Sequence, residues 1–427
     1  MMRCLFVLRE LPRPTISVAD AFNGREALSG THTSGLLVAE GLARRGHAIG
    51  VCILAGQELV DCTFQPFSDL ADASRWIGTG RVIWLSYGDD VILERLRSEH
   101  LSPTIWTQLP ISRTERAWLE DGSISGLLTV SDTCRIPLMH SRRRALLGRV
   151  YNPLAPVFTE EAPVSPDRYD RHSVAYAGAA GPTKGLHRLL ETWRYARQLD
   201  ESAKLLVAGT GRLYGSTREL GKFGIASPEF EARFVAPIAR DFGSLTAAGI
   251  EIVGLLQPTE LRDLYRGASL GVVNMNWNEF TETFCCAATE MLATALPVFS
   301  VARGALPETI GRSGGAFLTT HRSPRKAAAD LVSLLRDARK LSSLGLSGRQ
   351  YVREQYGLDH ILDQWTDLLS QGSDLERLAG PWRGPRSIHY LAALAAGRVG
   401  MPELVDGPSR MLRKVKAFRA AKNVTVP

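Results

Sequence analysis

The most informative run of this chain is NEFTETFCCAATEMLATALP, residues 278–297. It follows an apolar run at 270–273, and PVFSVA, which begins at its last residue, has the pattern of a buried strand. Cys, Ala, Met and Leu dominate 285–293, which predicts a helix, and Thr281 or Thr283 is placed to cap its N-terminus. Strand, polar turn, helix and strand in this order are typical of a parallel α/β sheet.

Two glutamates, Glu282 and Glu290, have seven residues between them in this run. Eight residues of α-helix rise about 12 Å and turn about 80° beyond two full turns, so on one helix the carboxylates would share a broad face. That separation excludes a shared metal ion but suits two distant parts of one extended ligand. At the mouth of the helix, beside Glu282, free N–H groups favour an anion. The spacing alone also fits two solvated glutamates, because glutamate is common in helices.

The run continues as ALPVFSVARGALPETI, and the whole stretch resembles the Glu-x7-Glu signature of retaining glycosyltransferases of family 4. The matching positions are Glu282, Thr283, Phe284, Glu290, Pro297, Val298, Gly304, Pro307 and Glu308. The resemblance implies transfer of a hexose from a nucleotide-diphosphate sugar with retention of anomeric configuration. It implies that Glu290 holds the ribose hydroxyls. Glu282 would contact the donor sugar's hydroxyls, with the backbone N–H groups of Thr283 and Phe284 close by.

The net charge of +7 is concentrated at the C-terminus. Six basic residues and no acid lie between Pro408 and Pro427, which leaves +1 for the remainder and argues against a nucleic-acid partner. Met411, Val415 and Phe418 recur at helical spacing among these basic residues, as in a helix that lies on an anionic membrane surface. A frayed terminus or a helix packed on the body is the alternative. The membrane hypothesis predicts that truncation after Asp406 abolishes binding to anionic vesicles.

Cysteine usage and hydropathy favour a cytoplasmic protein, with the basic tail as its route to the inner face of the membrane. The six cysteines form no Cys-x-x-Cys pair, which favours free thiols, a reducing compartment and no zinc site. No uncharged apolar run approaches ~20 residues, so no transmembrane helix is predicted. The apolar run in MMRCLFVLRELPRP is too short for a signal peptide and is typical of a first strand.

The first half of the chain opens as a βαβ unit. A strand at 2–8 is followed by the Gly-containing segment 29–35, then a helix from Leu36 that breaks at Arg45-Gly46-His47 before the next strand. Gly30 would let backbone N–H groups approach a phosphate at a helix N-terminus, although a tight turn also requires glycine. The segment resembles the first loop and helix of the same glycosyltransferases.

Further strands are predicted at 81–88, 104–110, 126–132 and 149–155, which together form a parallel sheet with ligand groups at the carboxyl ends. Gln108 ends one of them. Many relatives carry a histidine near this position that faces the donor sugar, so the resemblance makes Gln108 a catalytic candidate despite the difference.

Metal ligands for a diphosphate are not evident. Asp89-Asp90 is the only acidic doublet after a strand, and no Asp-x-Asp occurs in the chain. This argues against a divalent cation. We therefore expect a metal-independent protein without a cofactor, with the nucleotide sugar as its donor substrate.

The second half repeats the pattern. Residues 156–172 mix Pro, acids and Arg and predict a linker. HSVAYAG, KLLVAGTG, IEIVG and LGVVN then alternate with helices as the strands of a second domain. Gly178, Gly209 and Gly254 follow three of these strands and are candidates for donor binding.

A lysine marks the loop after the first of these strands. Lys184 and Gly185 occupy the Lys-Gly position of the resembled family, where the ammonium reaches the donor diphosphate; this makes Lys184 a catalytic and donor-binding candidate. The family's arginine directly after the strand glycine is replaced by Ala179. Arg212 or Arg303 is a candidate substitute, and backbone N–H groups are the alternative.

The predicted architecture is α/β, with two Rossmann-like domains facing a central cleft (GT-B). The parts are an N-terminal acceptor domain (1–160), a C-terminal nucleotide-sugar donor domain (173–355), a helix crossing back to the first domain (356–372) and a basic extension (373–427). Residues 322–371 have the pattern of two helices. The segment 212–249 is longer than a usual connection and is predicted to be an insertion over the cleft.

The predicted function is transfer of a hexose to a hydroxyl group of a glycan or lipid-linked acceptor. Two other classes stay open. A GT-B epimerase would form product without an acceptor, and a phosphorylase would require inorganic phosphate. A non-catalytic nucleotide-sugar-binding protein would have no turnover, and the Glu290→Ala substitution would only lower its affinity for the nucleotide.

Overall fold

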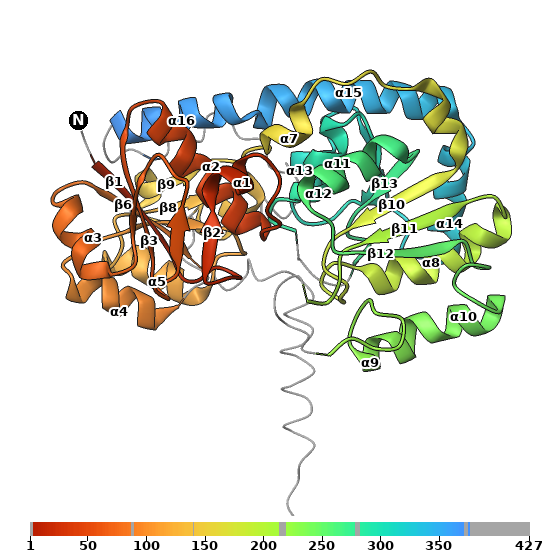
Figure 1. Ribbon diagram of the computed structural model, residues 1–427, viewed down its shortest axis with the longest axis horizontal. Coiled ribbons are helices and arrows are strands. Elements are labelled where there is room, and N and C mark those ends of the chain that lie inside the picture. The colour runs from red at the N-terminus through yellow and green to blue at the C-terminus, as the bar shows by residue number, and fades with distance from the viewer. Residues whose placement is uncertain are drawn as a thin grey trace, which may run out of the picture.

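The computed structural model describes residues 3–86, 89–139, 141–212, 219–277, 282–370 and Leu375. Two parallel sheets, each flanked by helices, lie side by side in the molecule (Figure 1). This confirms the predicted α/β class. The basic tail, with Met411, Val415 and Phe418, and the proposed cap Thr281 lie outside the described residues.

Within the described residues the first sheet has seven parallel strands in the order β5-β3-β1-β6-β7-β8-β9. Their bounds are β1 Arg3–Leu8, β3 Ala48–Ile53, β5 Gln65–Phe67, β6 Arg81–Ser86, β7 Thr104–Thr107, β8 Gly126–Thr129 and β9 Leu147–Arg149. A small separate sheet pairs β2 (Thr15–Ser17) with β4 (Glu58–Val60). The main strands are apolar runs because helices cover both faces of a parallel sheet.

The prediction of a strand over 149–155 is wrong. β9 ends at Arg149, and the chain beyond it makes only an isolated bridge between Leu154 and Gly357. Pro153 has no N–H to donate to a ladder, and the N–H of Leu154 donates instead to the carbonyl of Tyr356 at 2.7 Å.

Short helices connect the strands of the first domain. They are α1 Val18–Phe22, α2 Gly30–Arg44, α3 Leu70–Ile77, α4 Asp90–Ser98, α5 Arg113–Asp121 and α6 Asp132–Arg135, with 3₁₀ turns at Ile136–Leu138 and Arg144–Leu146. The acidic doublet has a structural explanation: the Asp89 carboxylate accepts from the N–H of Val91 and caps α4.

The described part of the second sheet has six parallel strands in the order β12-β11-β10-β13-β14-β15. Their bounds are β10 Ser173–Ala177, β11 Lys204–Ala208, β12 Ile250–Gly254, β13 Leu270–Val272, β14 Val298–Val301 and β15 Ala316–Thr319. The helices of this half are α7 Pro156–Thr159, α8 Leu186–Leu199, α9 Pro228–Phe230, α10 Ala236–Phe242, α11 Pro258–Gly267, α12 Cys286–Ala293, α13 Leu306–Thr309, α14 Pro324–Leu335 and α15 Ala338–Tyr356, with a 3₁₀ turn at Pro166–Arg171 and a π-helix at Glu231–Val235.

The described part of the predicted insertion packs beside α8. The buried carboxylate of Glu231 accepts hydrogen bonds from three backbone N–H groups of the preceding turn, those of Phe223, Ile225 and Ala226. The N–H of Gly211, just after β11, donates to the carbonyl of Ile225 at 2.8 Å. The rings of Phe234 and His187 lie 5.2 Å apart. The insertion is therefore fixed beside the N-terminal turn of α8.

The chain returns to the first domain through its last described helix, α16 (Leu358–Ser370), which packs against α2 and lies with α15 along one edge of both domains (Figure 1). Trp365 of α16 is fully buried, with its ring 5.5 Å from Phe6 and 4.9 Å from Trp106. Two helices were expected over 322–371, but the described part of this stretch, 322–370, forms three, because Asp337 caps α15 and Gly357 separates it from α16. No described helix is long and apolar enough to cross a membrane.

Candidate functional site

The order of the second sheet defines a site at its centre. β10 has β11 on one side and β13 on the other, so the connections after β10 and β13 leave in opposite directions. Ligands of open parallel sheets bind at such switch points, outside the carboxyl ends of the strands. The loop after β10 carries Lys184, and the loop after β13 carries Glu282. The topology therefore brings together two candidates from separate motifs.

The three candidate glycines lie together at this edge. The N–H of Gly178 donates to the carbonyl of Ala208, and the N–H of Gly209 donates to that of Gly254 at 2.6 Å. Gly209 has φ 102°, and a Cβ on it would lie 2.2 Å from the carbonyl oxygen of Gly178. Only glycine fits there, so these turns leave the edge of the sheet without side chains.

Lys184 and Glu282 form an ion pair, with Nζ of the lysine 2.9 Å from Oε1 of the glutamate. The same oxygen accepts a hydrogen bond of 3.0 Å from Nδ2 of Asn274, and the Glu282 side chain is buried. Gly185, at φ 70°, lets the lysine loop press against the end of β13, where a Cβ would lie 2.8 Å from Oδ1 of Asn274. A buried carboxylate is thus paired with a half-buried ammonium at the switch point.

Glu282 does not lie on the helix with Glu290, contrary to the sequence-based prediction. α12 begins at Cys286, with Cys285 as an N-cap whose side chain makes no capping bond. The carbonyl of Glu282 accepts from the N–H of Ala305, and the hydroxyl of Thr283 donates to another residue, so neither enters or caps the helix. The predicted cap at Thr283 is therefore wrong, and the separation calculated for one helix does not apply.

Glu290 lies one turn into α12 and is half-buried. Among the described residues its carboxylate has no hydrogen-bond or ion-pair partner. Burial raises its pKa from the ordinary 4.5 to about 7. The hydroxyl of Tyr265, which is close enough to feel the charge of Glu290, is also buried without a partner. A carboxylate in such surroundings is suited to accept hydrogen bonds from a ligand.

The N-terminal ends of α2 and α12 meet between the domains. The predicted Gly-containing loop is the first turn of α2, which starts at Gly30 and not at Leu36 because the Ser29 hydroxyl caps it by accepting from the N–H of His32. A Cβ on Gly30 would lie 3.1 Å from Sγ of Cys286, the first residue of α12. The N-termini of these two helices therefore face the same region between the domains, and each favours an anion there.

Gln108 of the first domain contacts the second. Its carbonyl accepts a 2.7 Å hydrogen bond from the hydroxyl of Thr283, and its Oε1 accepts one of 2.8 Å from Nδ2 of Asn152. Nε2 of Gln108 and Oδ1 of Asn152 are buried and have no hydrogen-bond partner among the described residues. Gln108 is an amide that does not titrate, so it can orient a group but not act as a proton-transfer base. Sequence reasoning missed Asn152, for which no local pattern gave a signal.

Phe284 belongs to an apolar junction. It is buried with its ring 6.0 Å from that of Tyr151 in the first domain and 5.1 Å from that of Tyr356. Its side chain therefore has a structural role, and only its backbone N–H group remains a candidate for donor binding. Glu308, a further position of the resembled motif, reaches across the junction and accepts a 2.9 Å hydrogen bond from the Tyr151 hydroxyl.

Two arginines were candidates to replace the one missing at Ala179. Arg212 is exposed at the end of its described segment. Arg303 is half-buried just after β14, and its Nε has no hydrogen-bond partner. The next residue, Gly304, packs on the backbone of Glu282, since a Cβ there would lie 2.5 Å from the Glu282 carbonyl oxygen. Arg303 is therefore the candidate whose position fits.

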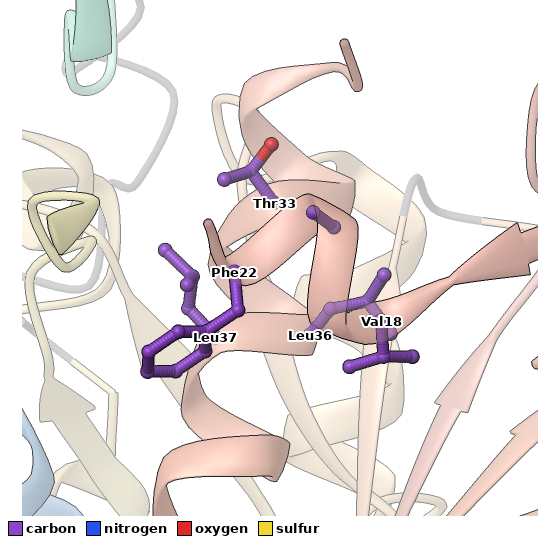
Figure 2. Close-up of a pocket in the computed structure, with 6 residues that line it drawn as sticks. Val18, Phe22, Thr33, Leu36 and Leu37 are labelled. Atoms are coloured by element: carbon purple, nitrogen blue, oxygen red, sulfur yellow. The ribbon is translucent and has the colours of Figure 1, made fainter. Parts of the chain in front are cut away.

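A separate hollow between α1 and α2 does not form this site (Figure 2). Its lining is Val18, Ala21, Phe22, Thr33, Leu36 and Leu37. Apart from Thr33 these side chains are apolar, so the hollow offers no group to hold a phosphate.

The molecule has two doubly wound parallel sheets. A charged site lies at the switch point of the second sheet, and the N-terminus of a helix from the first domain lies opposite this site. This arrangement is that of the GT-B class of glycosyltransferase folds. Residues 158–351 match the family described as Glycosyl transferases group 1, so the chain carries a glycosyltransferase group 1 domain.

Comparisons with known proteins give one sequence relative and two structures with the same fold. The chain is 22% identical over 330 residues to the GDP-mannose-dependent alpha-(1-6)-phosphatidylinositol monomannoside mannosyltransferase of Mycobacterium tuberculosis, covering 73% of this chain and 75% of the relative. Sucrose-phosphate synthase from Thermosynechococcus elongatus superposes with a TM-score of 0.65 at 14% identity, over 87% of this chain and 99% of that one. Anabaena HepE in complex with UDP gives 0.63 at 14% identity, over 86% and 100%. These two structures establish the fold.

Proposed function

We propose that this protein transfers a hexose from a nucleotide-diphosphate sugar to a hydroxyl group of a glycan or glycolipid, with retention of anomeric configuration. The observation that carries the proposal is the Lys184–Glu282 pair at the switch point, with Gly30 and the N-terminus of α2 opposite. This arrangement provides a cation, a carboxylate and two helix N-termini around one candidate donor site.

The charges assign a role to each end of the donor. Glu290, which has no partner among the described residues, accepts from the ribose hydroxyls. Lys184, Arg303 and the N–H groups at the start of α2 and α12 neutralise the diphosphate in place of a divalent cation. Glu282 accepts from hydroxyls of the transferred sugar. Fixed donors of this kind stabilise charge that develops on a leaving group.

In the transfer, the bond between the anomeric carbon and the phosphate oxygen breaks, and a bond to the acceptor oxygen forms on the same face. The leaving phosphate takes the acceptor proton, which requires no protein nucleophile. Gln108 and Asn152 lie beside the site as neutral amides and orient hydroxyl groups without changing charge.

The donor and acceptor are proposed from the sequence relative. Its printed name specifies GDP-mannose and a phosphatidylinositol-linked acceptor, so GDP-mannose and a lipid-linked mannoside are the first substrates to test. HepE was solved with UDP, which makes UDP the second nucleotide to test. A peripheral position at the inner face of the membrane, reached through the basic tail, suits a lipid-linked acceptor.

Ala179 stands where the resembled family has an arginine directly after the strand glycine. The lack of that cation favours a second candidate, a nucleotide-sugar-binding protein without transferase activity. Both candidates require nucleotide binding at Glu290, and they differ only in turnover.

A thermal-shift screen with GDP, UDP and ADP, on wild type and Glu290→Ala, tests the proposal. A ligand at ~100 times its Kd stabilises a protein by about 2.7 kcal/mol, so one diphosphate should raise the Tm of wild type clearly. The shift should be lost in Glu290→Ala and kept in Glu354→Ala, which removes an exposed glutamate of α15. Release of that diphosphate from its sugar, dependent on acceptor and unaffected by a chelator, then establishes transfer. No shift with any nucleotide contradicts the proposal, and binding without turnover favours the second candidate.

A further inference from the structure

Asn274 occupies a central place in the site that no sequence motif marks. It is the second residue after β13 and is 4% exposed. Nδ2 of its amide donates to Oε1 of Glu282 at 3.0 Å and to the carbonyl of Thr183 at 3.1 Å. Its Oδ1 accepts from the N–H of Asn276 at 2.9 Å. One short side chain thereby joins the lysine loop, the glutamate and its own strand end.

These contacts require an amide. Only an amide offers both a two-proton donor and an acceptor at this size. An aspartate would set a second carboxylate against Glu282, and an alanine would leave the buried groups that now pair with Asn274 without that partner. The Asn274 carbonyl also accepts from the Ser300 hydroxyl at 2.9 Å, so β14 anchors the residue itself.

We infer that Asn274 is a positioning residue, which holds the Glu282 carboxylate in register with the Lys184 ammonium so that both meet the donor together. Oε1 of Glu282 accepts a hydrogen bond of 3.0 Å from the Asn274 amide and one of 2.9 Å from the Lys184 ammonium, so two donors fix its position. This inference rests on the proposed function, because it assigns Asn274 to the same site.

Asn276 is the matched comparison. It is equally buried, at 4%, and its Nδ2 donates to the carbonyl of Pro182 at 3.0 Å, in the same lysine loop. This hydrogen bond ends on the lysine loop and not on Glu282, and the two asparagines lie on the same segment. Equivalent substitutions at the two positions therefore separate loss of loop packing from loss of the Glu282 contact.

The experiment compares Asn274→Ala, Asn274→Asp and Asn276→Asp in the full-length protein. Asn274→Ala should lower kcat about 10- to 100-fold, because displacing a catalytic group by even 1 Å can cost that much. Its Kd for the nucleoside diphosphate should stay within about 3-fold of wild type, since Glu282 addresses the sugar and not the nucleotide.

The aspartate variants give a pH signature that loss of packing would not produce. In Asn274→Asp the new carboxyl and Glu282 share a proton as the pH falls, and the shared O–H replaces the lost N–H donor. Its kcat relative to wild type should therefore rise as pH falls from 8.5 to 6. Among the described residues, the other titratable groups that face Glu282 are Lys184, Cys285 and Cys286. Burial raises the pKa of Cys285 well above its ordinary value and that of Cys286 to about 12, so neither thiol changes charge in this range.

Asn276→Asp should show no such rise. Equal pH profiles for the two aspartate variants, or full kcat in Asn274→Ala, overturn the inference while the proposed function stands. Absence of both nucleotide binding and turnover in wild type overturns the proposed function instead. If Asn274→Ala does not fold, the pH profiles of the aspartate variants still decide.

Discussion

The carboxylate of Glu308, in the second domain, accepts a 2.8 Å hydrogen bond from the backbone N–H of Thr133 in the first domain. It also accepts from the Thr133 hydroxyl at 2.6 Å, the N–H of Asp132 at 2.7 Å and the hydroxyl of Tyr151 at 2.9 Å. All four donors belong to the first domain, so one buried side chain forms four of the hydrogen bonds that join the domains.

Glu308→Gln should therefore lower stability by about 1–3 kcal/mol, because the new NH₂ group would face donors and leave at least one of them unsatisfied. Thermal unfolding of the variant measures the effect. Glu354→Gln, at an exposed position, is the control and should stay within about 0.5 kcal/mol of wild type. Equal Tm values for both variants would show that the contact does not hold the domains together.

Lys184→Met should weaken nucleoside-diphosphate binding about 10- to 100-fold. The substitution removes the cation and leaves the buried Glu282 carboxylate unpaired by it beside the proposed diphosphate site. Calorimetric titration gives the Kd. Lys204→Met, at the exposed start of β11, should bind as wild type. An unchanged Kd in Lys184→Met would remove the lysine from the diphosphate site.

The raised pKa of Glu290, at about 7, predicts a pH dependence of nucleotide binding. In the proposed complex the ribose hydroxyls donate to the ionised carboxylate, so affinity should increase as pH rises from 6 to 8 and level off above. Glu290→Gln should abolish this dependence.

The same pKa has a consequence for stability. A carboxyl whose folded pKa exceeds its unfolded value stabilises the fold fully below the unfolded pKa and loses that contribution as pH rises through the folded pKa. Glu290→Gln should accordingly raise the Tm relative to wild type at pH 8 more than at pH 5. Parallel curves for the two proteins would mean that the carboxyl titrates normally.

Gly30→Val should impair turnover by separating the N-termini of α2 and α12. A single Cβ already lies 3.1 Å from Sγ of Cys286, so a branched side chain must displace the helix. Adding Cys286→Ala to that variant should restore part of the activity, because the sulfur is what the valine meets. Gly267→Ala, where nothing lies within 4 Å, is the control and should be neutral in the same steady-state assay. A double variant no better than Gly30→Val would place the damage elsewhere.

Much of the fold could be predicted from local patterns. Apolar runs and the glycines after them gave the strands around Gly178, Gly209 and Gly254, because these features depend on neighbours in the chain. The start of α12 could not be predicted this way. By local sequence rules the hydroxyl of Thr283 could cap the helix. It donates instead to the carbonyl of Gln108, 175 residues away in the chain.

The candidate site shows the same division. Lys184, Glu282 and Glu290 stood out because they match a motif. The pairing of Lys184 with Glu282 joins residues 98 positions apart, and only the strand order reveals it. Asn274 and Asn152 gave no signal, since an asparagine near a strand end is usually part of a turn.

The position of α16 has a consequence for how the protein is made. Trp365 completes the core around Phe6 and Trp106, yet it is synthesised after almost the whole second domain. A ribosome adds about 5–20 residues per second, so the early domain waits on the order of tens of seconds for its last large side chain. During that time the apolar residues that Trp365 covers, Phe6 and Trp106 among them, lack this partner. The domain that is translated first therefore completes its core only after most of the second domain has been synthesised.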